Sequence, residues 1–185
     1  DYRARLLARA GAYEPAIRAT RLLERMAAFD KANPLQAPKE GVSVGRGFAL
    51  TASFHSYVGE IADVEIDKGD LKVRRVHAVV DCGFAIDPPN VAAQVRSGIN
   101  YGLTAALYGR VDFENGKVVP TNFDTYPLLS LDDAPSISVD ILNSGAALGG
   151  AGEIGTPPIA PAVANAVFAA TGKRLRSLPL TVGTA

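Results

Sequence analysis

The sequence has few of the residues that many functional sites require. Its 185 residues include one cysteine, Cys82, two histidines and no tryptophan. A single cysteine excludes an internal disulfide and a thiolate metal cage made within this chain. It also excludes a self-contained iron–sulfur cluster, which several cysteine thiolates must hold. The histidines, His55 and His77, lie far apart without paired carboxylates, so no metal-ligand set is predicted, and each is expected at a strand surface or in a loop.

Net charge and long apolar runs are also absent. Basic and acidic residues number 19 each, so no net field would recruit nucleic acid or an anionic membrane. No apolar run reaches the about 18 residues of a transmembrane helix, which predicts no direct membrane insertion. The sequence opens on Asp1 without a methionine or an apolar leader, and we expect it to be part of a longer chain.

Apolar residues make up 48% of the sequence, enough for a core. Residues 2–31 carry leucines and alanines at helical spacing with a break near Gly11, which predicts two surface helices. Residues 31–41 contain two prolines and resemble a linker. From residue 42 the apolar residues alternate, and a turn at 67–70 predicts an antiparallel meander of two or three strands.

The second half of the sequence mixes helix and strand patterns. Residues 91–108 predict a largely buried helix, and Asn115-Gly116 predicts a hairpin. Residues 136–141 alternate as a half-buried strand, and 159–171 form an alanine-rich helix ending at Gly172. The fold class is therefore α+β: antiparallel sheet with helices packed to one side. We expect a helical lead-in and linker over residues 1–41 and the main body over 42–185.

A glycine-rich turn, Gly149 to Pro158, contains Glu153, the last acidic residue of the chain. Its glycines match a dinucleotide-binding pattern, but two prolines follow and no acidic residue lies about 20 positions on, which excludes nicotinamide or flavin binding of that type. Two interpretations remain. The turn is structural with Glu153 in solvent, or Ile154, Pro157 and Ile159 partly desolvate a carboxylate that acts as a general base.

Three passages together resemble one family. They are Gly45–Leu50 leading into Ser53–Val58, Val80–Gly83 through Gln94 to Gly98, and Gly149–Pro161 leading into Ala162–Phe168. They resemble the molybdenum-binding large (beta) subunit of the xanthine oxidase family, in particular the isoquinoline 1-oxidoreductase and bacterial aldehyde dehydrogenase group. The resemblance covers nearly all of the chain after residue 42. It implies the C-terminal part of the molybdopterin-binding domain of a longer subunit.

The resemblance also implies a chemistry. Such enzymes hydroxylate an aldehyde or an N-heteroaromatic substrate with oxygen from water, and the glutamate matching Glu153 is the catalytic base. Gln94 matches a side-chain amide that contacts the cofactor, and the backbone N–H groups of Gly150, Ala151 and Gly152 are expected to line it. The implied cofactor is a molybdenum-pyranopterin in its cytosine dinucleotide form.

The implied partners are the remainder of the large subunit, an iron–sulfur small subunit and a small-molecule substrate. We expect the isolated chain to lack the cofactor and to be inactive. The alternative hypothesis is a cofactor-free structural or assembly module. At the level of single residues, Gln94 also fits an ordinary polar helix position, and the glycines also fit a tight packing turn. Cys82 is expected to be a small buried residue.

Overall fold

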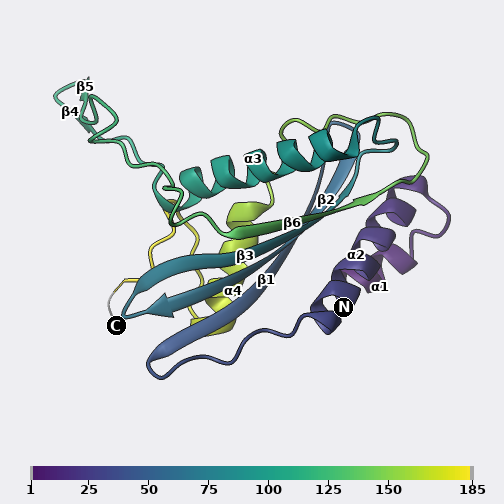
Figure 1. Cartoon of the computed structure of the whole chain (residues 1–185), viewed down its shortest axis with the longest axis horizontal. Coiled ribbons are helices and arrows are strands. Elements are labelled where there is room, and N and C mark those ends of the chain that lie inside the picture. Colours follow the sequence, from purple (N-terminus) through teal and green to yellow (C-terminus); the bar gives the residue numbers. More distant parts are fainter. Residues whose placement is uncertain (1, 184–185) are drawn as a thin grey trace.

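The computed structural model describes residues 2–183 and contains a four-stranded sheet with helices on both faces (Figure 1). The predicted α+β class is confirmed. In chain order the elements are α1 (Tyr2–Ala8), α2 (Glu14–Ala32), β1 (Val42–Ser53), β2 (Ser56–Asp67), β3 (Asp70–Asp81), α3 (Pro88–Leu107), β4 (Phe113–Glu114), β5 (Lys117–Val118), β6 (Ser136–Leu142) and α4 (Ile159–Thr171).

The main sheet has the order β1-β2-β3-β6. Strands β1, β2 and β3 form the predicted antiparallel meander, whereas β6 pairs parallel to β3, so the sheet is mixed. A parallel neighbour requires a crossover, which α3 and the segment after it provide. The β1–β2 turn was not predicted, because Phe54 and His55 adopt φ values of 52° and 60°, a conformation more usual for Asn and Gly.

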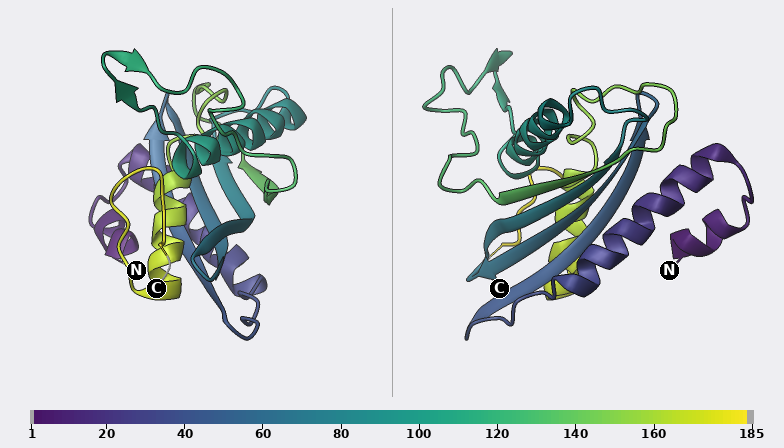
Figure 2. Two further views of the ribbon diagram at one scale, coloured as in Figure 1. Left: turned by 90° about the vertical axis from the view of Figure 1, so that its left-hand side faces the viewer. Right: turned by 45° about the vertical axis from the view of Figure 1, so that its right-hand side comes forward.

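Helices cover both faces of the sheet, so the expectation that they pack to one side was wrong (Figure 2). On one face, Leu22 and Met26 of α2 form a buried cluster with Ile61 and Val79. On the other face, α3 and α4 enclose a larger cluster that includes Val76. The central strands are apolar on both faces, and each face therefore needs a cover. A domain division at residue 41 stays a prediction.

Close packing on the α3 and α4 side depends on glycines. A Cβ on Gly47 would meet the backbone of Ala162 and Ala166, so α4 lies directly on β1. A Cβ on Gly98 would lie 3.2 Å from Oγ1 of Thr156, so the loop before α4 approaches this face of α3 closely. The opposite face of α3 is exposed. The helix is thus half-buried rather than largely buried.

His77 is buried, not at a strand surface as expected. Its ring stacks on Phe29 with centroids 3.7 Å apart and an interplanar angle of 3°. Its Nδ1 lies 2.8 Å from Oγ of Ser138. Burial lowers the pKa of His77, although Asp140 opposes this effect and Arg75 and Arg25 add to it. His77 therefore holds α2 and β6 together as a packed side chain.

Glu60 of β2 is a buried carboxyl group in the main core. It is 0% exposed, and neither carboxyl oxygen has a hydrogen-bond partner among the described residues. Its neighbours in register are alanines, Ala49 on β1 and Ala78 on β3. Burial raises the pKa of Glu60 well above its usual value. The folded protein therefore retains a proton that the unfolded chain releases.

Replacing Glu60 by methionine is expected to remove a pH dependence of stability. Because the folded pKa is raised, the contribution of Glu60 is intact below the unfolded pKa of about 4.3 and declines as pH rises toward the folded value, by about 1.4 kcal/mol per pH unit. Urea unfolding of both proteins from about pH 5 to about pH 8 measures this slope. Glu65→Met, which loses an exposed pair with Arg74, is the control. An unchanged slope in Glu60→Met would contradict the prediction.

Candidate functional site

The glycine-rich loop is fixed at its first end to the β1–β2 turn. The N–H of Gly150 donates to the carbonyl of Phe54 over 2.8 Å, and Ser56 Oγ donates to the Gly150 carbonyl over 2.6 Å. The N–H of Gly149 donates to the Cys82 carbonyl over 3.0 Å. A Cβ on Gly150 would lie 2.9 Å from Cβ of Phe54, so this contact requires glycine.

The far end of the loop is fixed to α3. Thr156 Oγ1 donates to the Gly98 carbonyl over 3.1 Å, and the Thr156 N–H donates to the Glu153 carbonyl over 3.0 Å. Ile154 is fully buried in the main core. A Cβ on Gly155 would lie 2.6 Å from the Val95 carbonyl oxygen, too close for any other residue. The backbone on both sides of Glu153 is therefore held in place.

Glu153 lies at a pocket of about 590 Å³ between this loop, the β1–β2 turn and α3. The side chain is exposed, and its carboxylate makes no hydrogen bond or ion pair with residues 2–183. The expected desolvation by Ile154, Pro157 and Ile159 is not found, because both isoleucines are buried in the core beneath the loop and Pro157 is itself exposed at the pocket. The pocket is lined by Phe54, Ser97, Gly98, Tyr101, Gly152, Glu153, Thr156 and Pro157.

The four residues expected at the cofactor lie in different environments. The N–H of Gly150 is already bonded to Phe54, so in this structure it cannot donate to a ligand. The N–H groups of Ala151 and Gly152 make no hydrogen bond within residues 2–183, and a Cβ on Gly152 would meet open space. Gln94 is exposed on α3, three residues before pocket residue Ser97, and so lies on the same helix face.

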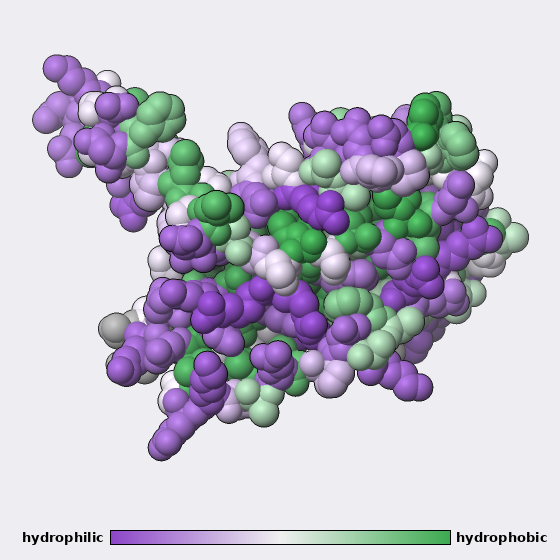
Figure 3. All heavy atoms as spheres, viewed as in Figure 1, coloured by the Kyte–Doolittle hydropathy of each residue, from purple (hydrophilic) through white to green (hydrophobic). Residues whose placement is uncertain are grey.

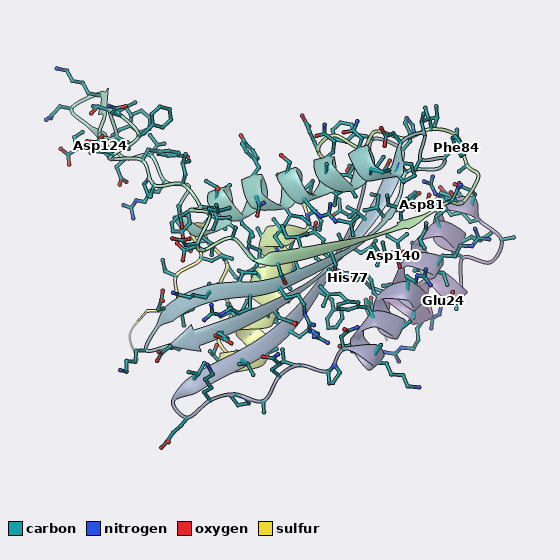
Figure 4. The ribbon with its side chains drawn as sticks, viewed as in Figure 1. Glu24, His77, Asp81, Phe84, Asp124 and Asp140 are labelled. Atoms are coloured by element: carbon teal, nitrogen blue, oxygen red, sulfur yellow. The ribbon has the colours of Figure 1, made fainter. Side chains whose placement is uncertain are left out.

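A buried ion pair that the sequence reasoning missed supports this end of the sheet. Arg18 of α2 donates from Nε to Oδ2 of Asp81 over 2.8 Å and from Nη1 to the His55 carbonyl over 3.2 Å. Ser144 Oγ donates to Asp81 Oδ1 over 2.7 Å (Asp81 is labelled in Figure 4). An aspartate at the end of a buried strand was the available signal, but its partner lies 63 residues away.

The ion pair changes the protonation of Asp81. Burial alone would raise the pKa of this carboxyl group, but hydrogen bonds from Arg18, Ser144 and the Gly83 N–H outweigh it, and the pKa is lowered. Asp81 therefore stays ionised, and together with Arg18 it joins α2, the β1–β2 turn and the segment that precedes the glycine-rich loop. Cys82, next to it, is buried as predicted.

Residues 2–183 offer no metal-ligand cluster of their own. Within that range, no three His, Cys, Asp or Glu side chains are grouped so that they could hold a metal ion. No helix in the described part of the chain is both long and apolar enough to cross a membrane.

Residues 12–135 match the family model of the molybdopterin cofactor-binding domain, a range that includes Gln94 and ends before the glycine-rich loop. The chain is 35% identical over 142 residues to the beta chain of isoquinoline 1-oxidoreductase from Brevundimonas diminuta, covering 76% of this chain and 18% of that protein. It is 34% identical over 160 residues to a nicotinate dehydrogenase chain of Pseudomonas putida, covering 80% and 14%. The chain thus spans less than a fifth of the length of these relatives.

Solved structures agree with this result. Quinoline 2-oxidoreductase from Pseudomonas putida 86 superposes with a TM-score of 0.60 at 30% identity, over 63% of this chain and 16% of that one. The Cu,Mo-CO dehydrogenase superposes with a TM-score of 0.58 at 24% identity, which concerns the fold alone. The chain belongs to the molybdopterin cofactor-binding domain family, within the molybdenum-binding subunits of the xanthine oxidase family.

Proposed function

We propose that this chain forms one wall of the active site of a molybdenum hydroxylase, with Glu153 as the general base. The observation that supports this most directly is the Glu153 carboxylate, which is exposed at a pocket and has no partner within residues 2–183, while the loop on both sides is held. A carboxylate without a partner remains able to accept a proton from a reacting group placed beside it.

The described residues fit one side of a molybdenum-pyranopterin. The N–H groups of Ala151 and Gly152, which are unpaired within the described residues, and the open space at Gly152 suit a ligand rich in hydrogen-bond acceptors. The Gln94 amide offers both donors and an acceptor to a pterin edge. Gly150 would serve by letting the loop pack on Phe54. When bound, the group supplies the two-electron redox chemistry of hydroxylation.

We take the bound form to be the cytosine dinucleotide. Releasing the cofactor from the complete protein by acid and identifying its nucleotide by chromatography tests this form. Cytidine monophosphate is expected. Recovery of a pterin without a nucleotide, or with a different one, would contradict it.

The overall reaction converts a C–H bond and water into a C–OH group, two protons and two electrons. Glu153 would take a proton from the water-derived oxygen that attacks the substrate carbon. Phe54 and Tyr101, both exposed at the pocket, would orient a flat substrate. Relatives named for isoquinoline, nicotinate and aldehyde oxidation support an N-heteroaromatic or an aldehyde as the substrate.

The proposal requires partners. The two electrons need an acceptor that a chain with one cysteine cannot build, and we propose an iron–sulfur small subunit. The remaining walls of the pocket would come from the rest of the large subunit, because this chain spans 18% of a relative's length. Metal analysis of the isolated 185-residue chain should therefore find no stoichiometric molybdenum. Stoichiometric molybdenum in the isolated chain would contradict the proposal that this chain forms only part of the cofactor site.

Isotopically labelled water tests the proposed reaction. The complete protein, given an N-heteroaromatic or aldehyde substrate in labelled water, is expected to place the label in the hydroxylated product, as mass spectrometry would show. The control is the same reaction in ordinary water under labelled dioxygen. Label arriving from dioxygen would refute the proposal. A complete protein without molybdenum would instead support the cofactor-free assembly module.

A further inference from the structure

Residues 110–128, which form an arm, extend from the C-terminal end of α3 and carry β4 and β5 (Figures 1 and 2). No residue of the arm is buried, and all except Pro120 and Tyr126 are exposed. Figure 4 shows Asp124 far from the other labelled side chains. The body of the described structure therefore does not cover the arm.

The arm nevertheless carries large apolar side chains. Phe113 and Phe123 are 69% and 82% exposed, and Val111, Val118 and Leu128 are also exposed. Figure 3 shows apolar atoms among polar ones on this projecting segment. Several large apolar side chains exposed on one short segment favour an interaction site there.

Few contacts within the chain hold the arm in its conformation. Strands β4 and β5 have two residues each, and the closing hydrogen bond runs from the Val119 N–H to the Asp112 carbonyl over 2.8 Å. An isolated two-stranded hairpin is marginally stable in water. The first bond back to the body, from the Leu129 N–H to Thr104 Oγ1 over 3.3 Å, lies beyond the arm. The described part of the chain thus gives the arm little support.

We propose that the arm docks on the remainder of the large subunit, in an apolar groove that receives Phe113 and Phe123. The family match over residues 12–135 contains the whole arm, so the arm belongs to the shared domain. The chain accounts for 18% and 14% of the length of two relatives, so more than four fifths of such a subunit lies outside it. The inference rests on family membership and not on the role of Glu153, so either can fail alone.

Hydrogen exchange tests whether the arm docks on the remainder of the large subunit. Arm amides in the isolated 185-residue chain should exchange rapidly, whereas in the complete protein purified from its source they should exchange at least about 100-fold more slowly. Equal rates in the two samples would overturn the proposal. So would protection in the isolated chain that rises with its concentration, which indicates a second copy. Protection lost on removing the iron–sulfur subunit would assign the arm to that subunit instead.

A pair of variants separates docking from a purely structural role. Phe113→Ser combined with Phe123→Ser should leave the unfolding free energy of the isolated chain almost unchanged, because these side chains are 69% and 82% exposed there. In the complete protein the same change should lower the melting temperature and restore fast exchange in the arm. Tyr13→Ser, which removes an aromatic side chain that is 64% exposed outside the arm, is the matched control. An equal loss of stability in both samples would overturn the proposal.

Discussion

Replacing Glu153 by glutamine is expected to lower kcat of the complete enzyme by about 10²- to 10⁴-fold, the contribution of a positioned general base. Glutamine keeps the shape of the side chain and removes its ability to accept a proton. The carboxylate makes no hydrogen bond or ion pair with residues 2–183, and the loop is held by its backbone and by Thr156. The variant should therefore fold and unfold like the parent protein.

Two measurements make this expectation specific to catalysis. Molybdenum content and unfolding free energy should be unchanged in Glu153→Gln while turnover falls. Glu24→Gln, an exposed glutamate on α2 that is labelled in Figure 4, should alter none of the three. Wild-type turnover in Glu153→Gln with full metal content would refute the assignment of the base.

Replacing Arg18 by methionine should destabilise the protein by about 3–5 kcal/mol, since removing one partner leaves a buried charge uncompensated. The side chains of Arg18 and Asp81 are 7% and 0% exposed. Arg25→Met on the same helix breaks the pair with Asp140, but those side chains are 55% and 31% exposed, so a loss of at most about 1 kcal/mol is expected. Equal losses in the two variants, measured by urea unfolding, would contradict the prediction.

The Arg18–Asp81 pair also predicts that the stability of the folded protein decreases in acid. Because the folded pKa of Asp81 is lowered, its contribution is present above the unfolded pKa of about 3.9 and is lost as pH falls through the folded value. Arg18→Met should therefore lose less stability on acidification than the parent protein. The double variant Arg18→Met with Asp81→Leu should recover part of the stability, because two apolar side chains need no counter-charge.

Local structure followed well from the sequence. The hairpin at Asn115-Gly116 and the end of α4 at Gly172 were predicted from residues that tolerate positive φ, and both occur. The two opening helices also occur, and the strand predicted at 136–141 is observed as Ser136–Leu142. In each case the deciding forces act between residues a few positions apart.

Long-range arrangement did not follow from the sequence. Nothing in the pattern of β6 indicates that it pairs parallel to β3, and nothing in α2 indicates which sheet face it covers. The turn at Phe54 and His55 carries no usual turn residue. It exists because the Gly149–Gly150 backbone packs on it, a contact between segments nearly a hundred residues apart.

The candidate site shows the same division. The sequence alone determined that a lone carboxylate stands in a glycine-rich turn before an apolar helix, and its motifs indicated the family. Only the tertiary structure decided which N–H groups and which carboxylate of this turn are free to interact with a ligand. It commits the Gly150 N–H to Phe54, gives those of Ala151 and Gly152 no partner in the part of the chain that it describes, and holds Glu153 in solvent above a buried Ile154. The reason is physical: hydrogen-bond partners and burial are set by the segments that pack around a residue, and its own neighbours in sequence do not specify them.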